Sequence, residues 1–257
     1  MTSILIYDAS FEGFLTCIFQ IYEQRLNDVS IQKKHSVQNS IFGSTQEVNT
    51  NKEQADRVWN GIKKRIGKYG QTCLTYCFLS EKKGCEDLLY RYIQDVFRSK
   101  YSIEKNITNN VVLEVSKIMK SVGREKHRME AFVRFKLTKD TIYFANIEPD
   151  FNVLPLIIGH FKKRYADQRW IIYDSKRDTG VYYNLKSVTY VTIEFERSHN
   201  FTKTNSSIFT EEEIEFQQLW RDYFKSTNIP ARKNMRLHVK HVPKRYWKFL
   251  SEKTPND

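Results

Sequence analysis

Residues 141–174, TIYFANIEPDFNVLPLIIGHFKKRYADQRWIIYD, decide the fold that we expect for this chain. The stretch opens with TIYFANI and closes with RWIIYD, and both are short apolar runs typical of strands. Between them, Pro149 and Asp150 precede FNVLPLIIGHFKKRY, which we interpret as a helix. The stretch therefore predicts a strand, a helix and a second strand in succession.

The flanking segments extend this pattern to a sheet. AFVRFKL at residues 131–137 alternates with period two and predicts a strand before the stretch. VYYNL at residues 181–185 predicts another strand after it, and SVTYVTIEF at residues 187–195 follows as a strand or as extended chain. The order strand, strand, helix, strand, strand implies an antiparallel sheet with a helix on one face.

The N-terminal half is predicted to be mainly helical. ILIYD at residues 4–8 indicates one short strand, and residues 27–49 are polar, with one further short strand near residues 40–42 at most. Apolar residues at helical spacing predict helices elsewhere, in residues 11–25, 51–66, 71–79, 85–97, 111–122 and, after a capping box at Thr210 and Glu213, 211–225.

The fold class that we expect is therefore α+β. A mainly helical subdomain is predicted at residues 1–128, and an α+β subdomain with C-terminal helices and a basic C-terminal segment at residues 129–257. The two parts could also form one continuous domain, because no linker composition marks their border.

The charge of the chain bears on its partners. Its net charge is +12 and its pI is about 9.4, which favours a polyanionic partner such as nucleic acid or an anionic membrane surface. No apolar run approaches the roughly 18 residues of a membrane span, and the N-terminus lacks the basic region of a signal peptide. We therefore expect a cytoplasmic protein without a membrane partner.

The sequence motifs indicate no metal and no cofactor. There is no Cys-x-x-Cys pair, no glycine-rich phosphate loop and no Gly-x-Ser-x-Gly elbow. The cysteines are interpreted as small, reduced core residues; they are Cys17, Cys73, Cys77 and Cys85.

The strongest functional signal is the basic segment RKNMRLHVKHVPKRYWKFL at residues 232–250, which holds seven Lys or Arg, two His and no acid. Phosphates attract such a patch, and its Tyr and Trp could stack on exposed bases. Alternatively, its apolar residues dock a terminal helix on the body, with Pro243 in the first turn. The candidate nucleic-acid contacts are Arg232, Lys233, Arg236, Lys240, Lys244, Arg245, Tyr246, Trp247 and Lys248, with Lys163 and Arg164 extending the path.

A second group of residues could carry acid–base chemistry. Glu148 and Asp150 stand at a strand end, and Arg128 and His160 are candidates to join them. The alternative is that Asp150 caps the following helix and that Glu148 is a solvated strand end.

Four motifs, in order, carry a resemblance over nearly the whole chain: DASFEGFLTCIFQIYE, GREKHRMEAFVRF, IEPDFNVLPLIIGHFKKRYADQRWIIYD and VPKRYWKFL. Together they resemble a bacterial family of unknown function labelled a probable DNA metabolism protein. The gene of that family typically neighbours one for a putative DNA modification or repair radical SAM protein, and some relatives are fused to a uracil-DNA glycosylase domain. Relatives often have His after Glu-Pro-Asp, where this chain has Phe151, which weakens a catalytic role for Glu148 and Asp150.

Three functions follow as expectations. The first is a nucleic-acid-binding accessory protein of DNA repair or modification, which acts with the radical SAM companion that the resemblance implies. The second is a hydrolytic or glycosylase-like enzyme on nucleic acid, with its site at Arg128, Glu148, Asp150 and His160. The third is a protein-interaction module that binds no nucleic acid.

Overall fold

The computed structural model describes residues 3–34, 44–193, 209–227 and 234–253. In the helix that begins at Glu211, side chains are described up to residue 220. The chain divides into two compact units, Met1–Gly123 and Arg124–Asp257. Their border lies inside one continuous helix, α5 (Asn110–Phe132). The predicted subdomain border at residue 128 falls in the same helix and stays a prediction.

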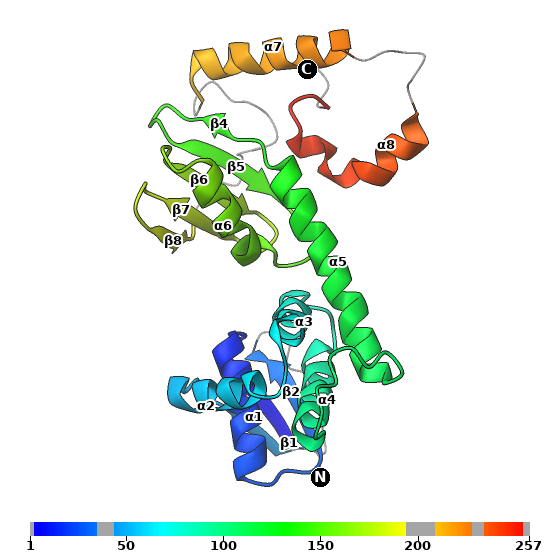
Figure 1. Cartoon of the computed structure of the whole chain (residues 1–257). Helices are drawn as coiled ribbons and strands as arrows, with labels where there is room; N and C mark the ends of the chain where they lie inside the picture. Colours follow the sequence, from blue (N-terminus) through cyan, green and yellow to red (C-terminus); the bar gives the residue numbers. More distant parts are fainter. Residues whose placement is uncertain (1–2, 35–43, 194–208, 228–233, 254–257) are drawn as a thin grey trace. The chain divides into compact units, whose positions relative to one another are not determined.

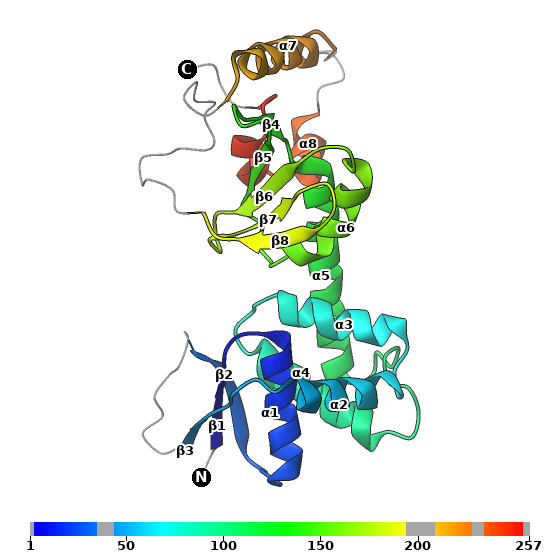
Figure 2. The same cartoon turned by 90° about the vertical axis from the view of Figure 1, so that its left-hand side faces the viewer.

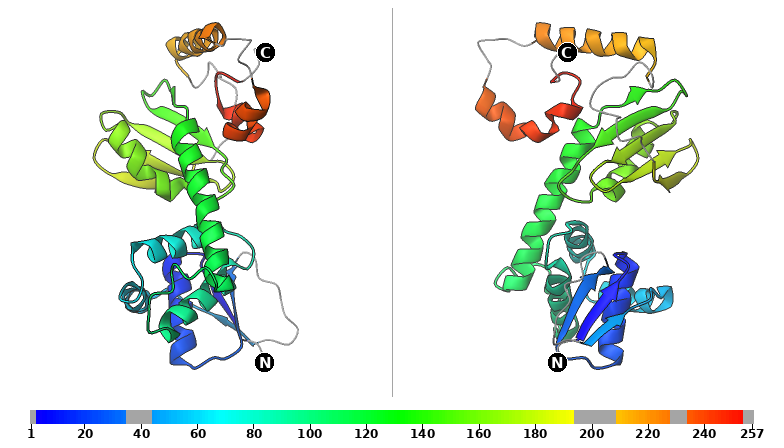
Figure 3. Two further views of the ribbon diagram at one scale, coloured as in Figure 1. Left: turned by 45° about the vertical axis from the view of Figure 1, so that its right-hand side comes forward. Right: turned by 180° about the vertical axis from the view of Figure 1, so that it is seen from behind.

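The first unit combines helices with a parallel sheet. The strands have the order β2-β1-β3, and β1 pairs in parallel with both neighbours. Ile4 and Leu5 point to opposite faces of β1 and are both buried, because α1 and α4 lie on opposite sides of the sheet (Figure 3, right). The elements are β1 (Ser3–Tyr7), α1 (Phe11–Glu23), β2 (Val29–Lys33), β3 (Ser44–Glu47), α2 (Lys52–Lys63), α3 (Lys68–Leu79), α4 (Cys85–Arg98) and the start of α5.

One sequence expectation for this unit needs correction. Residues 27–49 hold two strands rather than one at most, since β2 and β3 complete a three-stranded sheet with β1, while residues 40–42 lie outside the described residues. The four cysteines are buried free thiols, in agreement with a core role, and burial raises the pKa of Cys17 and of Cys77 to about 12.

The second unit is built on a five-stranded sheet of order β4-β5-β6-β7-β8 (Figures 1 and 2). α6 covers one face, where the ring of Phe161 lies 6.3 Å from that of Trp170. On the opposite face, Phe144 and Tyr173 pack with Phe209. The elements are β4 (Lys136–Leu137), β5 (Tyr143–Ile147), α6 (Leu154–Arg164), β6 (Trp170–Asp174), β7 (Thr179–Tyr183), β8 (Val188–Val191), α7 (Glu211–Thr227), α8 (Met235–His241) and a 3-10 helix (Lys244–Phe249).

The α+β class and the strand–helix–strand order are thus confirmed, but the sheet is mixed rather than antiparallel. β5 and β6 are parallel, because α6 carries the chain back across the sheet between them, and the other three pairs are antiparallel.

The expected strand at residues 131–137 is much shorter in the structure, because residues 133–135 are irregular. α5 continues to Phe132, and only Lys136 and Leu137 pair in the sheet. Val122, Glu125 and Met129 are each nearly inaccessible, which is the spacing of a helix face. None of the described helices is both long and apolar enough to cross a membrane.

Candidate functional site

The parallel strands β5 and β6 place two polar loops at one edge of the sheet, namely the edge that the carboxyl ends of these two strands form. Glu148 and Asp150 follow β5, and Ser175 and Arg177 follow β6. In sheets with parallel strands, ligand sites lie outside the carboxyl ends of the strands. The Glu148–Asp150 pair that the sequence singles out therefore lies at the edge where a site is expected.

The two loops are tied together by Arg177, which is held by an ion pair with buried Asp174 and reaches the loop after β5. Asp174 has no exposed surface, and its Oδ2 lies 2.8 Å from Nη1 of Arg177. Arg177 also donates to the carbonyl oxygens of Pro149 at 3.1 Å and Asp150 at 3.2 Å. Burial raises the pKa of Asp174, whereas the hydrogen bond and charge of Arg177 act in the opposite direction. Arg177 therefore fixes the backbone that carries the two candidate carboxylates.

Glu125, on α5, is the centre of the cluster and is 1% exposed. Each of its carboxylate oxygens lies 2.6 Å from the hydroxyl of Tyr246. Arg245 Nη2 donates to Oε2 at 3.0 Å, and the backbone N–H of Asp150 donates to Oε1 at 2.9 Å. Arg128 Nη1 is 3.6 Å from Oε2. A buried carboxylate needs such donors, so Glu125 holds the β5–α6 loop and the basic segment on α5.

Glu148 and Asp150, the two carboxylates that the sequence suggests for acid–base chemistry, are both paired with cations of the basic segment. Arg245 Nη2 lies 2.7 Å from Asp150 Oδ2, and Lys248 Nζ lies 2.5 Å from Glu148 Oε2. Ser175 Oγ donates to the other oxygen of Glu148 at 3.1 Å. The sequence singles out the strand-end acids and the C-terminal cations separately, and the structure pairs them with each other.

The basic segment is docked on the body at its C-terminal end (Figures 1 and 3). Tyr246 and Leu250 are 1% and 2% exposed, and the Tyr246 ring lies 5.5 Å from that of Phe132. Burial, followed by the hydrogen bond to Glu125, raises the pKa of Tyr246. Pro243 does not lie in the first turn of a terminal helix: α8 ends at His241, and Pro243 precedes the 3-10 helix.

This burial separates the two aromatic candidates. The Tyr246 ring is enclosed and serves as an anchor, so it has no free face for a base. Trp247 is half-buried; its Nε1 donates to the carbonyl oxygen of Val242 at 3.0 Å, and its ring lies 5.9 Å from that of His238. Trp247 is therefore the stacking candidate that remains.

Five described cations of the segment are exposed to solvent, and Arg245 and Lys248 among them are paired with carboxylates. Arg236 and Lys240 stand one helical turn apart on α8, and Lys244 begins the 3-10 helix. Within the described part of the chain, none of the three forms an ion pair with an acid. Arg232 and Lys233 lie outside the described residues.

Lys163, Arg164 and His160 do not join this cluster. α6 starts beside the carboxyl ends of β5 and β6 and runs back along the sheet, so its last turn lies at the opposite edge. Lys162 in that turn contacts the carbonyl oxygen of Lys186, which follows β7, in agreement with this placement. The structure thus separates the α6 cations from the Glu148–Asp150 edge.

The four acid–base candidates are only partly brought together. Asp150 and Arg128 contact Glu125, and Glu148 pairs with Lys248 of the segment that Glu125 anchors. The His160 ring instead lies edge-on to Phe161, with no hydrogen bond to the cluster among the described residues. In the described ranges there is no group of three or more His, Cys, Asp or Glu that could hold a metal ion.

Sequence reasoning missed Glu125, Asp174 and Arg177. Glu125 sits in GREKHR, where it looks like one charge of a solvated helix face. Asp174 ends the apolar run RWIIYD, and Arg177 follows it three residues later. A carboxylate at the end of a buried strand, with an arginine so close, was the available signal for this ion pair.

The second unit is therefore a mixed-sheet α+β structure with a basic C-terminal segment held by a buried carboxylate. Residues 83–252 match the model of a family described as a domain of unknown function, DUF4130, and this match covers more than half of the chain, so the chain belongs to that family. No curated protein matches the chain. The expected membership in a family of unknown function is thus confirmed, while the association with DNA metabolism and a radical SAM companion stays a prediction.

Proposed function

We propose that this chain is a nucleic-acid-binding accessory protein of DNA repair or modification. The observation that carries the proposal is the row of exposed cations Arg236, Lys240 and Lys244 on a segment without a single acid between residues 232 and 250. A net charge of +12 adds long-range attraction for a polyanion. The partner enzyme would be the radical SAM companion that the sequence resemblance implies, and the radical chemistry would belong to that enzyme.

The docking of the segment supports this role physically. A loose basic tail loses conformational freedom when it binds, whereas a segment already fixed by Tyr246 and Arg245 loses less. Arg245 and Lys248 are paired with carboxylates, so we assign them to fixing the segment and assign phosphate contact to Arg236, Lys240 and Lys244. Trp247 supplies an adjacent ring for stacking on an unpaired base.

The hydrolytic or glycosylase-like alternative draws on the same edge of the sheet. It needs a carboxylate that can take up or release a proton beside a substrate. Glu148 and Asp150 each hold a cation instead, and His160 lies apart from them. The geometry therefore favours binding over acid–base catalysis.

The salt dependence of DNA affinity tests the proposal. Each phosphate contact contributes about 0.9 to the slope of log affinity against log salt for duplex DNA. The triple variant Arg236→Gln, Lys240→Gln, Lys244→Gln should therefore flatten the slope by about 2–3 units. Fluorescence anisotropy with labelled duplex and single-stranded DNA, at several salt concentrations, measures it.

A matched control removes the same charge elsewhere. Lys63, Lys64 and Lys68 are exposed and lie outside the basic segment, so their triple Gln variant should change the slope by less than about 1 unit. Equal slopes for the two triple variants would show that only net charge matters, and an unchanged slope in the first variant would remove the assignment.

A further inference from the structure

α7 presents an apolar face to solvent. Phe216 is 67% exposed, Leu219 is 64% exposed and Trp220 is 45% exposed. These residues follow one another at spacings of three and one, so they lie on the same side of the helix. Single exposed apolar side chains are ordinary, but three together on one helix mark a contact surface.

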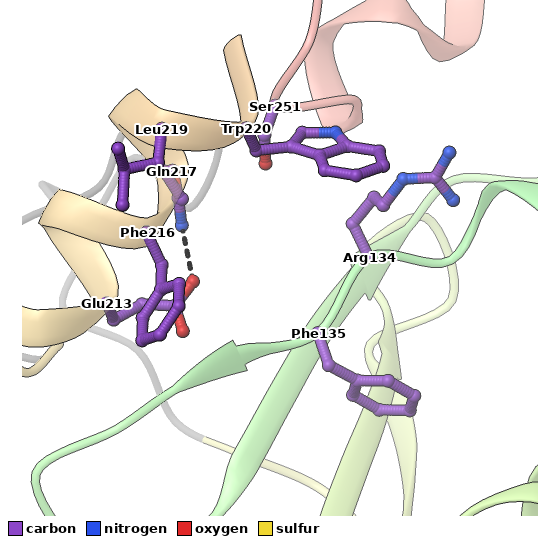
Figure 4. A pocket seen from close by; sticks show the side chains of 8 residues that line it. All are labelled: Arg134, Phe135, Glu213, Phe216, Gln217, Leu219, Trp220 and Ser251. Carbon is purple, nitrogen blue, oxygen red and sulfur yellow. Dashed lines mark hydrogen bonds between the residues drawn. The ribbon is translucent and has the colours of Figure 1, made fainter. Parts of the chain in front are cut away.

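The same face borders a pocket of about 550 Å³ (Figure 4). Figure 4 shows α7 on one side of it, Phe135 and Arg134 on the other, and Ser251 at its end. This volume lies within the range of sites that hold a ligand or a bulky side chain. The described residues that line it are Arg134, Phe135, Glu213, Phe216, Gln217, Leu219, Trp220 and Ser251.

The polar groups of the pocket wall are engaged within the chain. Glu213 accepts the backbone N–H of Leu137 at 3.0 Å and the side-chain amide of Gln217 at 2.9 Å. Glu252 accepts from Arg134 at 2.9 Å and from Trp220 Nε1 at 3.3 Å. An occupant thus meets mainly apolar surface, which suits an aliphatic or aromatic side chain better than a group that must be recognised by hydrogen bonds.

The rim of this face is acidic. The first ten residues of α7, EEEIEFQQLW at 211–220, hold four acids and no cation. Glu211, Glu212 and Glu215 are exposed beside the apolar residues. This is the reverse of the basic segment, so the unit carries two surfaces of opposite charge.

The charge decides between possible occupants. An acidic rim repels phosphates, which disfavours nucleic acid. Two copies that meet through α7 would bring their glutamates together, and the chain as a whole carries +12, which disfavours a second copy. An apolar surface flanked by Lys or Arg is complementary in both respects.

We propose that the α7 face, defined by Phe216, Leu219 and Trp220 with its glutamate rim, docks an amphipathic helix of a partner protein that bears Lys or Arg beside apolar side chains. An apolar side chain of that helix enters the pocket, and its cations meet Glu211, Glu212 and Glu215. This inference is independent of nucleic-acid binding by the basic segment, because no residue is shared between the two surfaces.

Two synthetic peptides test the proposal: an 18-residue helical Leu–Lys peptide with all Leu on one face, and the same peptide with Glu for Lys. With the full chain and fluorescein-labelled peptides, anisotropy should show binding of the Leu–Lys peptide at least about tenfold tighter than that of the Leu–Glu peptide. Equal affinity for both peptides would overturn the proposal.

Variants locate the contact. Phe216→Ser with Leu219→Ser should weaken Leu–Lys binding at least about tenfold, since two apolar side chains of the contact are removed. Tyr190→Ser is the matched control, because Tyr190 is 61% exposed on β8. Equal effects of the two changes would overturn the proposal.

The acidic rim is tested by the triple variant Glu211→Gln, Glu212→Gln, Glu215→Gln. It should weaken Leu–Lys binding and flatten its salt dependence, and unchanged affinity would remove the rim from the site.

Three readouts separate the other occupants. Self-association in sedimentation that the Phe216→Ser, Leu219→Ser variant abolishes would assign the face to a second copy and overturn the proposal. DNA affinity lost in that variant would assign the pocket to a base and overturn it too. A flatter salt dependence of DNA affinity in the Arg236→Gln, Lys240→Gln, Lys244→Gln variant, with peptide binding unchanged, is the result expected if both proposals hold. Peptide binding by a native chain that binds no DNA would remove the nucleic-acid proposal alone.

Discussion

The hydroxyl of Tyr246 lies 2.6 Å from both carboxylate oxygens of Glu125, a residue 121 positions earlier in the chain. The contact is buried at both ends, and it joins the C-terminal segment to α5. Because it fixes the segment whose cations we assign to phosphate binding, its removal should affect stability and binding together.

Tyr246→Phe tests this contact with little change of shape. The variant leaves the buried Glu125 carboxylate without one donor, so we expect a loss of about 1–3 kcal/mol in the free energy of unfolding. Urea unfolding measures it. Tyr190→Phe, on an exposed ring, should stay within about 0.5 kcal/mol. A Tyr246→Phe variant as stable as its control would contradict the anchoring role of the hydroxyl.

Arg245 and Lys248 should differ in energetic weight although both form ion pairs. Arg245→Gln removes a donor from Glu125, whose side chain is 1% exposed, so we expect a loss of about 1–3 kcal/mol. Lys248 and Glu148 are 47% and 37% exposed, so Lys248→Gln should cost about 0–1 kcal/mol because solvent screens the pair. Equal losses in urea unfolding would show that burial of Glu125 does not set the energy.

The sequence predicted the helices and strands whose apolar residues form a clear pattern, but it did not predict all of the strands or how they pair. β5, α6 and β6 stand where TIYFANI, FNVLPLIIGHFKKRY and RWIIYD predict them. β2 and β3 read VSIQK and STQE, which have no apolar run, and they are strands because β1 offers both its edges to them. The parallel pairing of β5 with β6 follows from α6, which carries the chain back between them, so the predicted strand–helix–strand order already implied it and the antiparallel expectation was wrong.

The candidate site was predictable to a similar degree. Glu148, Asp150, Arg245 and Lys248 stand out by charge and position in the sequence, and the structure pairs them. Glu125 was not found, because its role depends on Tyr246, which comes from the far end of the chain, packs against Phe132 of α5 and bonds to Glu125. Local sequence therefore indicated the members of the cluster at the surface, and tertiary structure supplied its buried centre.

The contact of α8 with the 3-10 helix, where the His238 ring lies 5.9 Å from that of Trp247, should weaken in mild acid. Nε2 of His238 is buried without a hydrogen-bond partner among the described residues. Burial lowers the pKa of His238 below 6.5, and the nearby charge of Lys253 lowers it further. The unfolded segment therefore binds a proton more readily than the docked one. The stability that the neutral ring contributes is present above pH 6.5 and is lost as the pH falls below it.

Limited proteolysis and unfolding between about pH 7.5 and 5.5 measure this effect across the ordinary range of histidine titration. Cleavage within residues 232–250 should rise as the pH falls, and His238→Gln should reduce that dependence. His241→Gln, at an exposed position of the same helix, is the control. A pH dependence that survives His238→Gln and disappears in His241→Gln would assign the effect to the wrong histidine.

Gly13 should tolerate no side chain, because of the polar turn that starts α1. Asp8 accepts hydrogen bonds from Ser10 and from the hydroxyl of Thr50, which is 2.8 Å away, and Ser10 caps the helix by accepting from Gly13 N. A Cβ at Gly13 would lie 2.3 Å from Asp8 Oδ1 and 2.8 Å from Thr50 Oγ1. Gly13→Ala must therefore displace the Asp8 carboxylate and weaken the cap.

We expect Gly13→Ala to cost about 1–3 kcal/mol in urea unfolding, through the lost cap and the overpacking. Gly159→Ala is the matched control: Gly159 is exposed on α6, and no atom lies within 4 Å of its added Cβ. That change should stabilise the chain by about 0.5–1 kcal/mol, since Ala is the better helix former. If both alanines stabilise the chain, the turn at Asp8 does not constrain Gly13 and the DASFEGF motif needs another physical explanation.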